Sequence, residues 1–160
     1  MKKAILDREK SEKKETKEKL KKYIRKSVLE QSARQAVQAF RREEDLADGY
    51  GCISCGKKPG ECATSMVLYG HEFDGGHYRS VGRARHLSLE PKNIHAQCVF
   101  CNRDLHSNAL EYRKGLIERY GQVYLDALEE DNAPRNYTRD QLISIAAEYR
   151  KKLRDLKRLG

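Results

Sequence analysis

The chain has 160 residues, of which 33 are Lys or Arg and 24 are Asp or Glu, so its formal net charge is +9. Charged residues make up 36% and hydrophobic residues 38% of the sequence. The apolar core must therefore be small, and we expect a metal or another staple to stabilise it. No run of about 18 apolar residues is present, which excludes a membrane-spanning helix. The first residues also lack the apolar segment of a secretory signal.

Charge and cysteine content indicate the partner and the compartment. The positive charge favours a polyanion, and nucleic acid is favoured over an anionic membrane surface. A charged protein without such a partner would have the same composition. The chain has five cysteines. Without an export signal we expect a cytoplasmic protein with reduced thiols, in which a metal site is more common than disulfides.

Residues 1–47 contain neither Pro nor Gly and are predicted to form one long, basic, charged helical arm. A sparse apolar stripe follows helical spacing through its second half, at Leu20, Ile24, Val28, Ala36, Val37 and Phe40. Asp48 and Gly49 are predicted to end this helix, with Gly49 as the residue after its C-cap. The arm is either a solvated helix, a basic segment that lies along DNA, or a coiled-coil partner.

Residues 48–106 contain all the cysteines and histidines and form the predicted loop-rich core. Residues 107–160 are predicted to be helical again, with a break at Gly121 and a connector over residues 131–137. Thr138 and Gln141 have the spacing of a capping box, which opens the last helix. Its apolar seam is expected to pack on the first long helix, within the chain or across a dimer; the seam residues are Leu142, Ala146, Tyr149, Leu153 and Leu156.

Two cysteine pairs have the spacing of a structural zinc site. Cys52 and Cys55 form one CxxC motif, and Cys98 and Cys101 form the other. Two residues between thiolates allow a tight turn to direct both sulfur atoms at one ion, and four thiolates form a closed tetrahedral site. The segment between the pairs is longer than in a plain zinc ribbon. Cys62 remains as a free thiol without an assigned role.

The long insertion carries residues suited to phosphodiester hydrolysis. FDGGHYRS contains His77 after two glycines, which allow a sharp turn and the close approach of a large ligand. Asn93 follows, and Asn102 comes directly after the second CxxC motif. This order matches the zinc-stapled HNH, or His-Me finger, nucleases. In such a site, neutral imidazole accepts a proton from water, and a hard ion held by oxygen ligands stabilises the leaving group.

The blocks CISCG, FDGGHYRS and NIHAQCVFCN, with the flanking helices, resemble the NinG/Rap recombination proteins of lambdoid phages over about residues 30–157. The zinc and Asn arrangement is also similar to Endonuclease VII. The resemblance implies a mostly helical α+β fold with a small ββα-metal core between long N- and C-terminal helices. It further implies a Mg²⁺-dependent endonuclease, with Mn²⁺ as a substitute, that cuts Holliday junctions and D-loops and is encoded by a phage or prophage.

The resemblance assigns roles to individual residues. His77 matches the general base, Asn93 the residue that orders the hairpin loop, and Asn102 a ligand of the catalytic ion. Typical HNH enzymes have an Asp ligand directly before the His, where this chain has Gly76, so Asp74 is the available carboxylate. DNA contacts are expected from residues around the site in sequence, namely Arg79, Arg83, Arg85, Lys92 and Arg103. His95 is expected either beside them, contacting phosphate or supporting the site, or in the core.

Several readings remain open. Symmetrical cutting of a four-way junction needs two active sites, so a homodimer is expected, with no membrane or small-molecule cofactor. A non-catalytic zinc-ribbon DNA-binding protein would keep the charge and the cysteines but make His77 and Asn102 incidental. An HNH nuclease acting on plain duplex, or an RNA-binding zinc module, would also have this composition.

Overall fold

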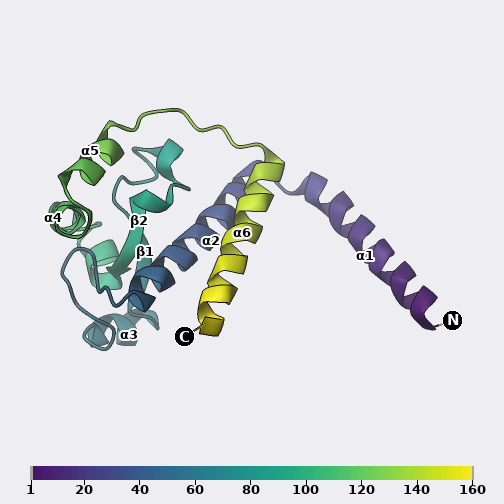
Figure 1. Cartoon of the computed structure of the whole chain (residues 1–160), viewed down its shortest axis with the longest axis horizontal. Helices are drawn as coiled ribbons and strands as arrows, with labels where there is room; N and C mark the ends of the chain where they lie inside the picture. Colours follow the sequence, from purple (N-terminus) through teal and green to yellow (C-terminus); the bar gives the residue numbers. More distant parts are fainter. Residues whose placement is uncertain (1, 160) are drawn as a thin grey trace.

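The computed structural model describes residues 2–159, except the side chains at positions 2–5, 8, 9, 17, 18, 20–22, 63 and 159. The fold is α+β and mostly helical, with one two-stranded sheet. Its helices are α1 (Lys2–Tyr23), α2 (Lys26–Ala47), α3 (Ala63–Tyr69), α4 (Ala109–Tyr120), α5 (Gln122–Glu130) and α6 (Arg139–Leu159), and its strands are β1 (Phe73–His77) and β2 (Ile94–Cys98). Short helical turns occupy Arg85–Leu87, Pro91–Asn93 and Phe100–Asp104. Figure 1 shows the hairpin on one side of α2 and α6 on the other.

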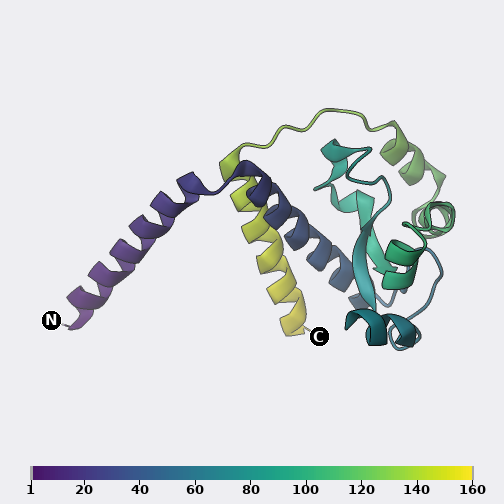
Figure 2. The same ribbon diagram turned by 180° about the vertical axis from the view of Figure 1, so that it is seen from behind.

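The predicted single helix over residues 1–47 is wrong, because the helix is interrupted between α1 and α2. Arg25 has an extended backbone, with φ −60° and ψ 142°. The carbonyl of Ile24 accepts a hydrogen bond of 2.6 Å from the Arg139 guanidinium, which belongs to the start of α6. Figures 1 and 2 show α1 extending away from the rest of the molecule. Leu20, predicted to belong to the apolar stripe, lies outside the described side chains.

Helices α2 and α6 pack against each other within the chain, as the apolar seam predicted. Their shared core contains Leu29, Ala33, Ala36, Leu89, Leu142 and Ala146. The capping box at the start of α6 is confirmed: the Thr138 amide donates to the Gln141 side chain at 2.8 Å, and the Gln141 amide donates to the Thr138 hydroxyl at 3.2 Å. The C-terminal end of α2 is also as predicted, with Gly49 at φ +79°. Helix α2 therefore belongs to the folded body of the protein.

Strands β1 and β2 form an antiparallel hairpin joined by the long loop 78–93. Phe73 pairs with Cys98 at one end of the ladder, and His77 pairs with Ile94 at the other. All five residues of β2 are buried, whereas in β1 Asp74 and His77 are half-buried and the other three residues are buried. Helix α2 packs against both strands. The register therefore places the start of β1 beside the second cysteine motif and the end of β1 beside the loop.

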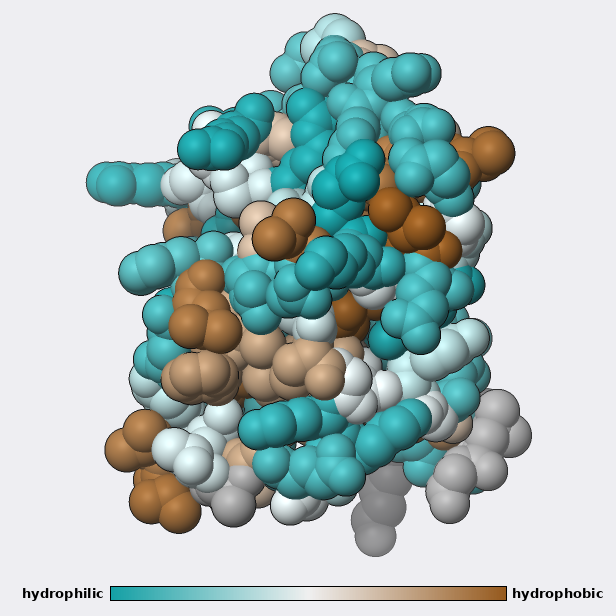
Figure 3. Space-filling view, turned by 90° about the vertical axis from the view of Figure 1, so that its left-hand side faces the viewer, coloured by the Kyte–Doolittle hydropathy of each residue, from teal (hydrophilic) through white to brown (hydrophobic). Residues whose placement is uncertain are grey.

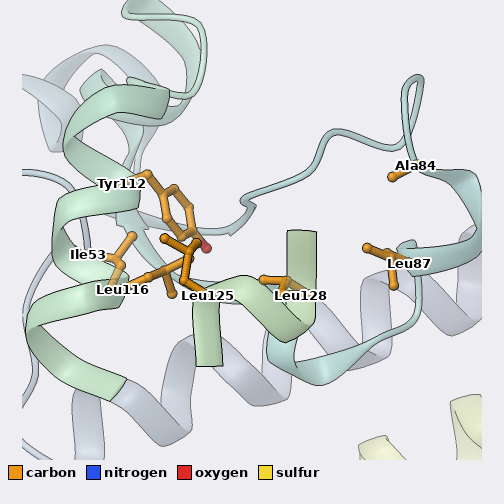
Figure 4. Close-up of a cluster of buried hydrophobic side chains, with 7 residues drawn as sticks. All are labelled: Ile53, Ala84, Leu87, Tyr112, Leu116, Leu125 and Leu128. Carbon is orange, nitrogen blue, oxygen red and sulfur yellow. The ribbon is translucent and has the colours of Figure 1, made fainter. Parts of the chain in front are cut away.

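A second apolar cluster joins α4 and α5 to the hairpin loop (Figure 4). It consists of Ile53, Ala84, Leu87, Tyr112, Leu116, Leu125 and Leu128. Gly121 separates the two helices with φ +86°, as predicted for a break. The Tyr112 hydroxyl donates to the carbonyl of Gly76 at 2.9 Å. Helix α4 is thus attached to β1 through this hydrogen bond.

The outer face over α4 and α5 is mainly hydrophilic, with hydrophobic groups gathered in separate small patches (Figure 3). Within residues 2–159, no helix combines the length and the apolar character needed to cross a bilayer.

Candidate metal centre and active site

The four predicted cysteines meet at one point. The sulfur atoms of Cys52, Cys55, Cys98 and Cys101 lie within 4.8 Å of one another. The Cys55 and Cys98 sulfurs are 3.8 Å apart, which is about the edge length of a tetrahedron with Zn–S bonds of roughly 2.3 Å. Gly56, at φ +75°, closes the first knuckle by donating its amide to the Cys52 carbonyl at 2.8 Å. The cluster has the donor type and spacing to hold a zinc ion.

Cys62 lies beside this cluster but is not one of its four ligands. Its side chain is buried together with Cys52, Cys98 and Cys101. His71 is not a ligand either, because it contacts Asp74, with 3.0 Å between His71 Nε2 and Asp74 Oδ1. Four cysteines complete the site without either residue.

Asp74 and Asn102 lie together at the open end of the hairpin. The Asn102 amide donates to Asp74 Oδ2 at 2.9 Å, and the Arg103 guanidinium donates to both carboxylate oxygens at 2.8 and 2.9 Å. Burial alone would raise the pKa of Asp74, but hydrogen bonds from Arg103, Asn102 and His71 hold it below its usual value. The carboxylate is therefore charged at neutral pH. It lines a groove of about 380 Å³ between the hairpin and α2.

The two glycines of FDGGHYRS have a packing role. They lie inside β1, not in a sharp turn. A Cβ atom at Gly75 would lie 2.5 Å from the backbone oxygen of Gln38 in α2, and one at Gly76 would overlap the Gln97 side chain. The space predicted for a ligand is filled by the protein itself. Gly75 lets α2 approach the strand closely, and the Gln38 side chain donates to the Gly75 carbonyl at 2.8 Å.

His77 ends β1 and is half-buried. Its Nε2 lies 3.0 Å from the carbonyl oxygen of Ser88. Because a carbonyl only accepts, Nε2 carries the proton and Nδ1 of the neutral ring is the proton acceptor. Burial lowers the pKa of His77; the Ser88 carbonyl raises it, and the positive charge of Arg34 lowers it further. The neutral imidazole needed for a general base is therefore the favoured form.

His77 does not contact the Asp74–Asn102 pair. Three residues separate Asp74 from His77 along β1, or roughly 10 Å between Cα atoms at about 3.3 Å per residue. Strand alternation also directs the two side chains to opposite sides, and puts Asp74 on the same side as position 76. Asp74 thus lies on the same side as position 76, where typical HNH enzymes have their carboxylate, but two residues earlier in the strand.

Asn93 orders the hairpin loop through its side chain. It is fully buried. Its Oδ1 accepts from the Arg79 amide at 2.8 Å, and its Nδ2 donates to the carbonyls of Arg79 and Leu87 at 2.9 and 3.2 Å. Its own carbonyl accepts from the Tyr78 amide at 2.9 Å. These are backbone hydrogen bonds of the kind expected of a residue that orders the hairpin loop, and they fix the chain on the C-terminal side of His77.

His95 belongs to the core, so its predicted alternative as a phosphate contact is wrong. Its side chain is buried, and Nδ1 lies 3.2 Å from Asp45 Oδ2. Asp45 is itself buried and paired with Arg41 and Arg119. Sequence reasoning missed this charged network because its members come from α2, β2 and α4. Its local signal is the i, i+4 pair of Arg41 and Asp45.

The cations predicted to contact DNA differ in their exposure and in whether the protein already binds their side chains. Arg79 is committed to the protein: its guanidinium donates to the carbonyls of Leu128, Glu129 and Asp131 at the end of α5, so the predicted DNA contact is not supported. Arg103 is paired with Asp74. Arg85 pairs with Glu30 but keeps 77% of its side chain exposed. Arg83 and Lys92 are exposed.

The fold and site define a mostly helical α+β protein with a four-cysteine site able to hold zinc. The chain belongs to the family described as Bacteriophage Lambda NinG protein, whose profile matches residues 1–159. It is 40% identical to "Protein ninG" of Salmonella phage P22 over 125 residues, which cover 78% of this chain and 56% of that protein. It is 39% identical to "Protein ninG" of Escherichia phage lambda over 125 residues, covering 78% of this chain and 55% of that protein.

The matched region spans little more than half the length of these curated relatives. No solved structure matches the chain.

Proposed function

We propose that this protein is a metal-dependent, structure-specific DNA endonuclease. It hydrolyses phosphodiester bonds in branched recombination intermediates such as Holliday junctions and D-loops, in the cytoplasm of a phage-infected bacterium. The observation that carries the proposal is that the four-cysteine site adjoins the Asp74–Asn102 pair. Asn102 directly follows the second CxxC motif, and its side-chain amide donates to Asp74 Oδ2 at 2.9 Å. An HNH site consists of a β-hairpin followed by a helix. This chain has the same order: the hairpin carries His77 at the end of β1, and a helical turn follows β2.

The residues present fit a hard divalent cation. Asp74 provides a charged carboxylate, and the Asn102 Oδ1 atom makes no hydrogen bond to any residue that the structure describes. Oxygen donors of this kind, beside an open groove, suit Mg²⁺ or Mn²⁺. When bound, such an ion would stabilise the charge that develops on the transferred phosphate and on the leaving oxygen. Arg103, 46% exposed, would release Asp74 as the ion enters.

The protein's own groups supply the remaining steps. His77 Nδ1 would take a proton from the attacking water, while the Ser88 carbonyl holds Nε2–H and fixes the ring. Asn93 holds the loop on which this geometry depends. To be cut at this site, a phosphodiester would have to contact both His77 and the Asp74–Asn102 pair, which are separated along β1 and directed to opposite sides of it. A two-fold dimer would present two such sites to the two strands of a junction.

A non-catalytic zinc-ribbon DNA-binding protein is the second candidate. Two observations favour it: Arg103 already neutralises Asp74, and His77 does not contact the Asp74–Asn102 pair. In that case Asp74, Asn102 and His77 would only stabilise the hairpin.

The test compares DNA substrates. End-labelled four-way junction, D-loop and linear duplex of matched sequence are incubated with the zinc-loaded protein in Mg²⁺, Mn²⁺ or neither. The proposal expects metal-dependent cutting with preference for the branched forms. Equal cutting of all three would leave a nuclease for plain duplex. Tight binding without cutting in either metal would establish the zinc-ribbon alternative.

A further inference from the structure

Arg34 is a half-buried cation without a partner. It lies in the middle of α2, and no carboxylate or carbonyl within the described part of the chain bonds its guanidinium. The other half-buried arginines all have such partners; Arg41 binds Asp45, and Arg79 binds three carbonyls. Partial burial of a charge without compensation costs free energy, so an unpaired guanidinium at a groove wall is a site for an anion.

The surroundings of Arg34 indicate which anion. Arg34 and Ser88 both line a groove of about 940 Å³ between α2, the hairpin loop and the connector after α5. The Ser88 carbonyl binds the ring of His77. Arg34 is also near enough for its charge to lower the pKa of His77, an effect smaller than that of burial. The groove that Arg34 lines is therefore adjacent to the proposed general base, whose ring is held by Ser88, another residue of that groove.

Helix α2 connects this groove to the proposed metal site. Gln31 and Arg34 line the groove near His77, whereas Gln38 and Arg42 line the groove that contains Asp74 and Asn102. Arg34 and Arg42 are eight residues apart, or roughly 12 Å along a helix that rises about 1.5 Å per residue. That length is comparable to the roughly 10 Å between His77 and Asp74 on β1. One face of α2 thus runs alongside the whole proposed site.

We propose that Arg34 binds the phosphate on which His77 acts, and that the groove beside α2 receives the DNA strand on that side of the cut. This inference rests on the proposed function. A guanidinium can donate two parallel hydrogen bonds to the non-bridging oxygens of a phosphate, which a Lys cannot reproduce. Sequence reasoning placed all site cations between residues 79 and 103. It treated Arg34 only as part of the basic arm, because the position of Arg34 beside the site depends on how α2 packs against β1.

The first experiment measures binding without catalysis. Binding of a fluorescent four-way junction is titrated in Ca²⁺ over a series of KCl concentrations, for wild type, Arg34→Ala, Arg34→Lys and Arg154→Ala. Arg154 is an exposed residue of α6, so its substitution is a control with the same charge change. We expect Arg34→Ala to weaken binding by about tenfold and to reduce the salt-dependence slope by about one, as for one lost phosphate contact. Arg154→Ala should change neither.

The second experiment measures single-turnover cleavage in Mg²⁺ at saturating protein. We expect Arg34→Ala to slow cleavage by at least about tenfold even when all DNA is bound, and Arg34→Lys to restore binding better than cleavage. Zinc content and thermal unfolding verify that each variant is folded. If Arg34→Ala does not fold, the binding and cleavage of Arg34→Lys are compared with those of wild type instead.

The outcomes separate the two proposals. If wild type cuts no DNA but Arg34→Ala still loses affinity and slope, the nuclease proposal fails while the phosphate site stands. If Arg34→Ala and Arg34→Lys bind with wild-type affinity and slope, the role of Arg34 is overturned, whether or not wild type cuts.

Discussion

The Asn102 amide donates a 2.9 Å hydrogen bond to the Asp74 carboxylate, although 28 residues separate them in the chain. Two local structures produce this contact. The ladder pairs Phe73 with Cys98, which places Asp74 beside the second knuckle, and the helical turn Phe100–Asp104 presents Asn102 to it. A metal at the four cysteines would therefore hold in place the element that positions Asn102.

Zinc removal should unfold the knuckle and the hairpin end together. The unfolded chain has no preformed zinc site, so the free energy of zinc binding adds to the free energy of folding. In small zinc domains this contribution is on the order of 10 kcal/mol. We expect Cys98→Ser to lose bound zinc and to melt at a much lower temperature. Cys62→Ser is the matched control, since Cys62 is buried beside the site but is not a ligand. Zinc analysis of the purified variants decides: loss of zinc from Cys62→Ser would contradict the four-cysteine assignment.

Asn93→Ala should destabilise the fold and not only the site. The substitution leaves half-buried backbone groups at Arg79 and a buried carbonyl at Leu87 without their side-chain partner. We expect a loss of about 2–4 kcal/mol in the free energy of unfolding, measured by urea titration. Asn136→Ala, at an exposed position in the connector, should stay close to wild type. Equal stability of the two variants would show that the loop does not depend on Asn93.

Gly75→Ala should separate α2 from the hairpin. The added Cβ would meet the backbone of Gln38, which cannot move without shifting the helix. Overpacking of this kind costs about 1–3 kcal/mol. Gly82→Ala places a Cβ in open space and should change stability by less than about 0.5 kcal/mol. Thermal unfolding of the two variants side by side tests whether the glycine pair exists for packing.

The acid limb of the pH–rate profile should lie below the usual His value of 6.5. Burial lowers the pKa of His77, with a further contribution from Arg34. A general base acts when deprotonated, so the rate rises with pH through this lowered pKa and is on its plateau at neutral pH. Single-turnover cleavage between pH 5 and 8 tests this. A limb above 6.5 would assign the ionisation to another group.

The features that could be predicted from sequence are those set by neighbouring residues. The knuckle turn at Gly56, the helix break at Gly121 and the capping box at Thr138 each depend on a few adjacent positions, and all three are present. The four-cysteine site was predictable because CxxC spacing fixes the sulfur geometry of each pair.

Other features depend on residues far apart in the chain. The break at Arg25 coincides with a hydrogen bond from Arg139, more than 100 positions away. The burial of His95 depends on Asp45 and on Tyr120 and Tyr124. The commitment of Arg79 depends on carbonyls at the end of α5. Charge and position along the sequence cannot distinguish an arginine that holds a helix end from one that is free to bind DNA.

The proposal that this protein is a nuclease with His77 as its general base is tested most directly by single-turnover cleavage of a labelled four-way junction in Mg²⁺. Wild type and His77→Ala are compared, and zinc content and junction binding are measured on the same preparations. We expect both proteins to bind zinc and the junction, and wild type to cut at least about a hundredfold faster, which is the usual contribution of a general base. Cutting by His77→Ala at the wild-type rate would contradict the proposal.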